Sequence, residues 1–408
     1  MGKRAEGRRS VKDRDFASIF AFATFWVVIA IGCWLGLRIV HAMGWTGTDQ
    51  RSSQPAPAIS TAHGSVSHLA PPQLSLASIF APQPVSLAGY DQRKIRTLIA
   101  TGDVIPARTV NYKMVTSNDF TAPFRPTAAY LRTADMTLIN LESPLIGASC
   151  RVANDTTMTF CGDPRFVQGL QLAGVDTACT ANNHIGNYGN EGIQETWSHL
   201  RAAHIGFCGY GSVDHKTIRG LRFAFLAFNC VGNRFDYTLA RRQIDAEHRA
   251  GNVVIVSVHW GKEYVALPQA APGVADDDPQ RVAHWIIDSG ADLIIGNHPH
   301  HVQGVEWYHH RLITYAHGNF IFDQMFPARE CVNTSDHNCC PGDGNRFCST
   351  REGVVGAYTF YGRQLVRVRY RPVVIYDWWQ PRWADPASAR IIMQHMQAAT
   401  QQLSYRHG

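Results

Sequence analysis

The sequence GADLIIGNHPHH (Gly290–His301) decides the fold of this chain. It contains a short apolar run that is closed by glycine, a pattern typical of a buried strand. Ligands of open α/β sheets bind just beyond the carboxyl ends of the strands, and His298 and His300 follow at that place. On extended backbone, alternation puts both imidazoles on one side, as a transition metal requires. The alternative is that these histidines are ordinary surface or core residues.

Four other apolar runs end in polar side chains of the same kind. Arg96–Val104 ends in Asp103, Met136–Leu141 is followed by Glu142, Val175–Thr180 by Asn183 and His184, and Val253–Val258 by His259. Helical patterns separate these runs, so the alternation predicts an α/β fold with a sheet packed between helices. Because all five strand ends carry groups that bind metals, we expect them to form one shared site.

The remaining patterns complete this prediction. Helices are expected over residues 124–133, 164–173, 191–203, 245–250, 279–289 and 386–403, the last with Asp385 as its N-cap. A further strand is expected over Leu221–Asn229. A hairpin is expected between strands near Val305 and Leu312, with His309 and His310 in its turn. Residues 354–375 are expected to form closing strands.

The N-terminal region predicts a membrane anchor. Phe16–Leu37 contains no charged side chain over 22 positions, and about 20 apolar residues span a bilayer core. The first fifteen residues hold six Lys or Arg, so the positive-inside rule places the N-terminus in the cytoplasm and the remainder outside. A signal peptide cleaved near residues 40–42 is the competing interpretation.

These observations divide the chain into five parts. We expect a cytoplasmic tail (1–15), a transmembrane helix (16–38), a linker rich in Pro, Ser and Ala (39–91), an extracytoplasmic domain (92–385) and a C-terminal helix (386–408). The net charge is +6, of which the first fifteen residues supply +3. The remainder is nearly balanced, which argues against a nucleic-acid partner.

The cysteines fit an oxidising compartment, because nine of the ten follow the predicted anchor. Cys150 and Cys161 are candidates for pairing around a short loop. A segment of about residues 329–350 resembles a disulfide-stapled insertion, with a zinc site as the alternative; its cysteines are Cys331, Cys339, Cys340 and Cys348. Cys179, Cys208 and Cys230 lie in apolar settings that suit free buried thiols.

A series of short motifs resembles the CapA family of bacterial capsule and poly-γ-glutamate synthesis proteins, also called PGA_cap. The motifs are Gly102-Asp103, Asn140-Leu141-Glu142, Ala181–His184, His259–Tyr264, Gly296–His300 and Gly318–Phe320. They stand in the family's order over about Arg96 to Asp323. The family is similar to the calcineurin-like metallophosphoesterases, so the resemblance implies a metallophosphoesterase-like sheet sandwich flanked by helices.

The resemblance also implies roles for individual residues. The metal ligands would be Asp103, Glu142, Asn183, His259, His298 and His300, with His184 as the acid that meets the leaving group. Asn182, Glu263, His317 and Asn319 would lie beside the ligands. The sequence departs from the phosphoesterase pattern at Ile105, where a histidine is usual, at Asn182, where glycine is usual, and at Asn297, where the CapA family often has histidine.

Carboxylate, amide and imidazole ligands suit Mn, Fe or Zn, so one or two divalent ions are the expected cofactor. Such a centre would make hydroxide available near neutral pH and favour hydrolysis at a phosphoryl or acyl centre. The expected partners are the membrane, a nascent anionic polymer or capsule precursor, and a synthesis or export complex. The competing hypothesis is a non-catalytic, membrane-anchored scaffold that grips the polymer, which the membrane anchor and the absent histidine favour.

Overall fold

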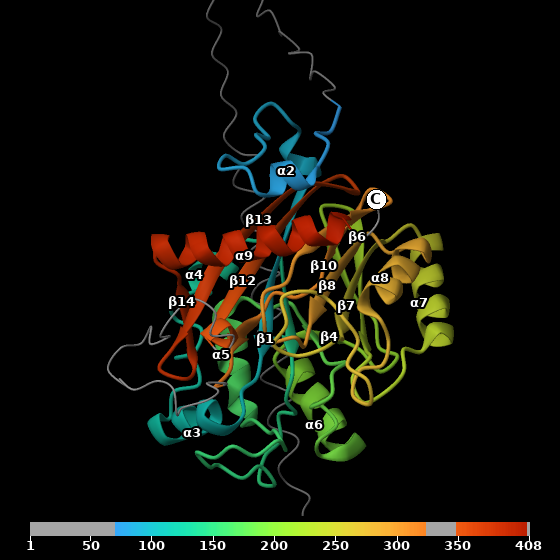
Figure 1. Ribbon diagram of the computed structural model, residues 1–408. Helices are drawn as coiled ribbons and strands as arrows, with labels where there is room; N and C mark the ends of the chain where they lie inside the picture. Colours follow the sequence, from blue (N-terminus) through green and yellow to red (C-terminus); the bar gives the residue numbers. More distant parts are fainter. Residues whose placement is uncertain (1–69, 324–347, 406–408) are drawn as a thin grey trace, which may run out of the picture. The chain divides into compact units, whose positions relative to one another are not determined.

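The computed structural model describes residues 70–323 and 348–405, which belong to one compact unit (Figure 1). Within these ranges, no helix combines the length and the apolar character needed to span a bilayer. The predicted transmembrane helix, residues 16–38, lies outside the described residues. So do Cys331, Cys339 and Cys340, and Cys348 stands at their boundary.

The first of two sheets is built around the strand that carries the Gly-Asp motif. Its order is β14 (Gln380–Trp383), β13 (Gln364–Tyr376), β12 (Glu352–Tyr361), β1 (Ile95–Val104), β2 (Met136–Leu141), β3 (Thr177–Cys179) and β4 (Gly206–Cys208), with β11 (Asn319–Ile321) also beside β1. The strands from β1 to β4 are parallel to one another. Their carboxyl ends therefore meet at one edge of the sheet.

The second sheet contains the strand predicted from Gly290–His301. Its order is β5 (Asp214–Ile218), β6 (Leu221–Asn229), β7 (Val253–His259), β8 (Leu293–Asn297), β10 (Arg311–Thr314) and β9 (Val305–Tyr308). The strands β6, β7, β8 and β10 are parallel. The predicted hairpin is confirmed as β9 and β10, which pair antiparallel.

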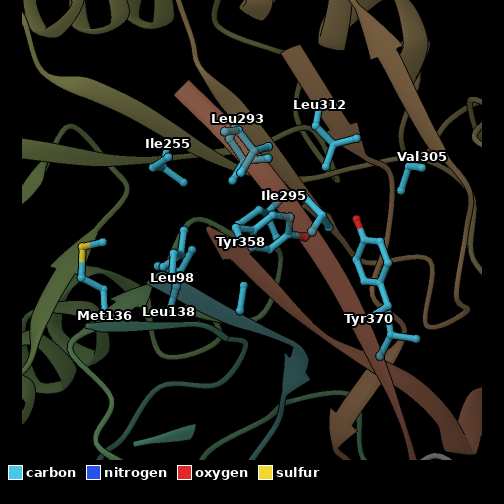
Figure 2. Close-up of a cluster of buried hydrophobic side chains, with 14 of the residues drawn as sticks. Leu98, Met136, Leu138, Ile255, Leu293, Ile295, Val305, Leu312, Tyr358 and Tyr370 are labelled. Atoms are coloured by element: carbon cyan, nitrogen blue, oxygen red, sulfur yellow. The ribbon is translucent and has the colours of Figure 1, made fainter. Parts of the chain in front are cut away.

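The two sheets pack face to face over an apolar core (Figure 2). Leu98 and Leu138 of the first sheet meet Ile255, Leu293 and Ile295 of the second in this cluster. Because side chains alternate along a strand, the neighbours of these residues face outward, against helices. Burial of each such aliphatic side chain stabilises the fold by roughly 1.5–3 kcal/mol, so this layer holds the two sheets together.

Helices cover the outer face of each sheet, which confirms the predicted α/β fold of sheets flanked by helices. The outward residues of β1 and β2 pack with α3 (Arg108–Ser117), α4 (Ala128–Leu131), α5 (Val167–Ala173) and α6 (Gly189–Ala202). Those of β6 and β7 pack with α7 (Tyr237–Arg249) and α8 (Pro279–Asp288).

The linker predicted over residues 39–91 ends earlier than expected. Leu74 and Ile79 are buried in the core between the sheets, and Ile79 belongs to the short helix α2 (Leu76–Ile79). Burying these apolar side chains in the core is more favourable in free energy than leaving them in a solvated linker. The C-terminal helix α9 (Pro386–Tyr405) joins the same core. Its predicted cap is confirmed, since the Asp385 carboxylate accepts from the Ala387 amide at 2.8 Å.

Two helices differ from their predicted extents for local reasons. Of the predicted helix 124–133, only Ala128–Leu131 is α-helical, because Pro126 cannot continue a helix from the preceding turn. Helix α7 starts earlier than the sequence pattern indicates, at Tyr237, where the Asp236 side chain accepts from the Leu239 amide at 2.9 Å.

Candidate metal centre

The predicted ligands converge at the shared carboxyl edge of the two sheets. Asp103 lies near the end of β1 and pairs with Asn140 of β2, while His259 at the end of β7 pairs with Asn297 of β8. Five of the predicted ligands are almost fully buried: Asp103, Glu142, His259, His298 and His300. Asn183 follows β3 and is half-buried. Strands far apart in sequence thus deliver one compact cluster of donors.

The cluster contains three overlapping sets of metal-compatible groups, and two of them share Glu142. Asp103, Glu142 and His300 offer ligand atoms within 4.8 Å of one another, and so do Glu142, His259 and His298. Asn183 joins the second set, because its side-chain oxygen lies 2.9 Å from Nε2 of His259. Glu142 belongs to both sets, so its carboxylate could contribute to holding an ion in either one.

The turn after β8 reaches this arrangement differently from the sequence prediction. The strand ends at Asn297, and His298 and His300 have φ of 95° and 50°. Extended backbone was expected there; a left-handed turn is found instead. Non-glycine residues in this region are strained, and such strain is typical of functional sites. The backbone amide of His298 donates to Oδ2 of Asp103 at 3.2 Å, which ties the turn to β1.

Hydrogen bonds fix the tautomer of His300. The Asn319 amide nitrogen donates to the Thr350 carbonyl at 2.8 Å, so its Oδ1 accepts from Nδ1 of His300 at 2.8 Å. Nε2 of His300 therefore remains for a ligand. Burial alone lowers the pKa of His300, but its hydrogen bond to Asp103 and the negative charges around it raise that pKa to about 10. A cation that binds Nε2 must therefore displace a proton from it.

Unpaired buried atoms of His298 and Glu142 indicate that this cluster fits a cation. Both ring nitrogens of His298 and Oε1 of Glu142 are buried without a hydrogen-bond partner among the described residues. Leaving such atoms unpaired costs about 1–3 kcal/mol each. Burial and the nearby positive imidazoles lower the pKa of His298 well below its usual value, which keeps its nitrogens available as ligands. These carboxylate, amide and imidazole groups fit a divalent ion such as Mn, Fe or Zn.

Asn140 is a site residue that the sequence analysis did not assign. Its amide nitrogen donates to Oδ1 of Asp103 at 2.8 Å, and its oxygen accepts from Asn182 at 3.1 Å. Asn182 in turn accepts from the Ile185 amide at 2.9 Å and so shapes the loop that carries Asn183. An amide side chain one position before the end of a mainly apolar strand is the pattern that would have indicated Asn140.

His184, the predicted acid, lies beside the ligands and is held on two sides. Asn187 Oδ1 accepts from the Phe160 amide at 2.6 Å, so it also accepts from Nδ1 of His184 at 3.1 Å. Nε2 is then the atom left to exchange a proton. The imidazole stacks on the Phe160 ring with centroids 3.8 Å apart. Burial lowers the pKa of His184, and the charge of Glu142 opposes that shift.

A disulfide closes the loop that brings Phe160 to His184. Cys150 and Cys161 are bonded, with Cα atoms 5.6 Å apart, as the sequence analysis predicted. Cys179, Cys208 and Cys230 are buried free thiols, which also confirms their prediction. Next to the loop, the buried Arg108 pairs with Asp323 and lies over the Phe160 ring.

Two of the four residues expected beside the ligands have distinct places. Glu263 lies with His298 and His300 as a third metal-compatible group, with Oε1 4.0 Å from Nε2 of His298. Its side chain is 36% exposed, so this carboxylate is in contact with solvent. His317 directs both nitrogens elsewhere, to the Thr101 carbonyl at 3.1 Å and the Tyr358 hydroxyl at 2.8 Å.

The fold and the site define an α/β protein of two packed sheets with a buried, metal-compatible cluster at their common edge. The model of the family "Bacterial capsule synthesis protein PGA_cap" matches residues 97–324. The chain belongs to this family.

Relatives with known names agree with this assignment. The chain is 26% identical over 254 residues to the "Capsule biosynthesis protein CapA" of Bacillus anthracis, covering 56% of this chain and 60% of that protein. It is 25% identical over 244 residues to the "PGA biosynthesis protein CapA" of Bacillus subtilis, covering 55% and 62%. The chain thus matches less than two thirds of each of these relatives. A solved hypothetical protein from Thermus thermophilus aligns with a TM-score of 0.40 and 14% identity, over 68% of this chain and 98% of that one.

Proposed function

We propose that this chain is a membrane-anchored, extracytoplasmic protein of capsule or poly-γ-glutamate synthesis and export, with a metal-dependent, hydrolase-type site. The family assignment supports the role in capsule or poly-glutamate synthesis. The observation that carries the site is His298, a fully buried imidazole whose two nitrogens both lack a hydrogen-bond partner among the described residues. A protein interior rarely leaves such atoms bare unless they bind something.

The membrane anchor and the compartment are supported by the sequence and by cysteine chemistry. Phe16–Leu37 carries no charged residue and follows six basic residues, the arrangement of an N-in anchor. The Cys150–Cys161 disulfide fits an oxidising environment outside the cytoplasm. In that compartment the domain would meet an anionic polymer or precursor as it leaves the membrane complex.

The residues divide into two groups in the proposed mechanism. Asp103, Glu142 and His300 would hold one ion, and Glu142, Asn183, His259 and His298 a second. A divalent ion there would supply Lewis-acid chemistry and make hydroxide available near neutral pH. Asn140 and Asn319 hold the ligands in place, through Oδ1 of Asp103 and Nδ1 of His300.

His184 would complete the reaction by giving a proton to the leaving oxygen. Its Nδ1 is held by Asn187, which leaves Nε2 for the transfer. Stacking on Phe160 restricts the ring to one orientation. A histidine fixed in this way is suited to general acid–base work, which typically contributes a factor of about 10²–10⁴ in rate.

A non-catalytic polymer scaffold is the second candidate, and Ile105 favours it. This side chain is fully buried in an apolar cluster at the place where the phosphoesterases have a histidine. The first ion would therefore have fewer protein ligands than in those enzymes. A scaffold of this kind would keep the polymer-binding surface and the fold while lacking turnover.

Metal content separates a metal site from a coincidental cluster. The full chain, purified in detergent without chelator, is compared by elemental analysis with His298→Ala/His300→Ala. The matched control is His309→Ala/His310→Ala, two residues in the turn of the β9–β10 hairpin. We expect about one to two ions per chain in the parent and control, and loss of metal in the folded site variant. A metal-free parent after addition of Mn or Zn would refute the metal site.

Turnover then separates the enzyme from the scaffold. The metal-loaded protein is assayed against a phosphodiester and against an amide-linked glutamate polymer, beside His184→Gln. Hydrolysis that falls by about 10²-fold or more in the variant, with metal content unchanged, would support the catalytic role of His184. Metal binding without hydrolysis of either substrate would favour the scaffold.

A further inference from the structure

A polar cavity lies at the amino ends of the parallel strands of the second sheet. It has a volume of about 260 Å³, and its lining residues are Gln73, Asp292, Trp307, His310, Arg311, Arg363, Gln364 and Leu365. Asp292 directly precedes β8, whereas His298 directly follows it. An extended strand of this length places the two residues about 20 Å apart. The cavity is therefore a separate site from the metal cluster, at the opposite end of the same strand.

Two arginines from different sheets meet at this cavity. Arg311 is the first residue of β10 in the second sheet, and Arg363 lies in the turn between β12 and β13 of the first sheet. Nη2 of Arg311 is 3.1 Å from Oδ1 of Asp292, and Nη2 of Arg363 is 3.7 Å from Oδ2 of the same carboxylate. Because both guanidinium groups contact one carboxylate, they stand side by side in the cavity wall.

The cavity carries a surplus of positive charge, because two guanidinium groups face one carboxylate. Asp292 is the one acidic residue of the lining, its side chain is 6% exposed, and its Oδ2 accepts from the Val254 amide at 2.9 Å. Arg363 also donates to the Asn252 carbonyl at 2.8 Å, which orients its guanidinium without neutralising it. The side chains of Arg311 and Arg363 are 41% and 42% exposed, so an anion can reach them.

Neutral groups and an apolar wall complete the cavity. The side chains of Gln73, Gln364 and His310 make no hydrogen bond with other described residues, so their donors are open to a ligand. Trp307 and Leu365 pack in the core between the sheets, which fixes their position in the wall. Hydrogen-bond donors from three separate segments therefore surround a small space beside two positive charges.

We propose that this cavity binds a phosphate group, as a phosphoester or as phosphate itself. Guanidinium groups pair well with phosphate, whose oxygens accept several N–H bonds at once. A planar carboxylate has two oxygens and would leave part of this donor set without a partner. The volume lies below the roughly 300–1,000 Å³ of sites for drug-sized ligands, so the cavity suits a small head group.

Two sources supply this chemistry, a lipid head group and a free phosphate compound. The lipid source is favoured by the predicted anchor, residues 16–38, which precedes Gln73 in the chain. Tryptophan is also enriched at the level of lipid head groups, and basic pockets near a membrane bind anionic head groups. Phosphate binding itself goes beyond the proposed function, whereas the lipid source rests on the anchor of that proposal.

The test is a calorimetric titration of the full chain in non-ionic detergent, at constant ionic strength and with EDTA present throughout. The probes are inorganic phosphate and glycerophosphoglycerol, the head group of phosphatidylglycerol without its acyl chains. The variant Gln73→Glu/Gln364→Glu adds carboxylates to the cavity and keeps the ion pairs of Asp292. The matched control is Gln168→Glu/Gln194→Glu, at exposed positions of α5 and α6.

We expect binding of both probes to weaken about tenfold in the variant, because the added carboxylates repel phosphate. The control should bind like the parent. His310→Glu, in the exposed turn between β9 and β10, is a second variant and should weaken binding in the same direction. Tighter binding of glycerophosphoglycerol than of phosphate supports the lipid source, and the reverse order supports a free phosphate compound.

Two results would overturn the inference. Either the parent binds neither probe in EDTA, or the variants, shown to be folded by their melting temperatures, bind both probes as tightly as the control. EDTA keeps the metal centre out of the measurement, so His298→Ala/His300→Ala should bind like the parent. A parent that holds no metal but binds phosphate in the cavity refutes the metal site alone. A parent that holds metal but lacks cavity-dependent binding refutes this inference alone.

Discussion

The buried His317 is expected to make the fold sensitive to acid. Its Nδ1 donates to the Thr101 carbonyl of β1, and its Nε2 accepts from the Tyr358 hydroxyl of β12. Burial lowers the pKa of His317 to about 4. A second proton would place a positive charge on a fully buried imidazole, and desolvation disfavours that charge.

The direction and size of this effect follow from the two pKa values. The folded pKa lies below the unfolded value of about 6.5. The stabilisation is therefore complete above about pH 6.5 and is lost as the pH falls towards the folded pKa of about 4. Linkage gives a loss of about 2 kcal/mol between neutral pH and about pH 5, and about 3 kcal/mol in total.

Urea unfolding of the parent and of His317→Gln, in EDTA at about pH 7.5 and about pH 5, measures this loss. Glutamine does not titrate, so the variant should be less stable at neutral pH but should lose about 2 kcal/mol less on acidification. His309→Gln, which replaces an exposed histidine, serves as the control and should keep the parent's pH dependence. An identical pH dependence in parent and His317→Gln would refute the reasoning.

Three further outcomes follow from the described contacts. Reduction of the Cys150–Cys161 bond should lower stability by about 3 kcal/mol, because it frees a short closed loop; thermal unfolding with and without reductant, beside the double Ala variant, measures this. Asn140→Ala should weaken metal affinity by about 10–100-fold while the fold is kept, since this side chain orients a ligand; a metal titration followed by calorimetry would show no change if Asn140 were unimportant. Gly296→Ala should prevent correct pairing of β8, because its Cβ would lie 1.9 Å from the Tyr315 carbonyl oxygen, and native-like soluble protein at the parent's melting temperature would contradict this.

Much of the fold could be predicted because buried parallel strands are continuous apolar runs. Met136–Leu141 and Leu221–Asn229 have the predicted limits, since polar residues or glycine bound each run. The convergence of Asp103, Glu142 and His259 could be predicted as well. Parallel strands in a sheet place their carboxyl ends at one edge. A polar residue at the end of such a strand is therefore expected in the site.

The rest depends on contacts that a sequence pattern does not contain. The left-handed turn at His298 and His300 arises from a tertiary bond to Asp103, and local preference alone favours extended backbone for histidine. The role of Asn140 depends on which side chains of neighbouring strands lie opposite it. Helix α3 was not predicted, because few of its residues are apolar and it buries the polar Asn111.

The overlap of the two ligand sets at Glu142 has a consequence for charge balance. Asp103 and Glu142 are the two carboxylates buried in the cluster, and one divalent cation neutralises both. A second cation would then bring a net charge of about two units into a low-dielectric interior, which is costly without a counter-charge. Glu263, which is partly exposed, supplies only one negative charge. The second ion and an anionic substrate are therefore expected to bind together, each raising the affinity of the centre for the other.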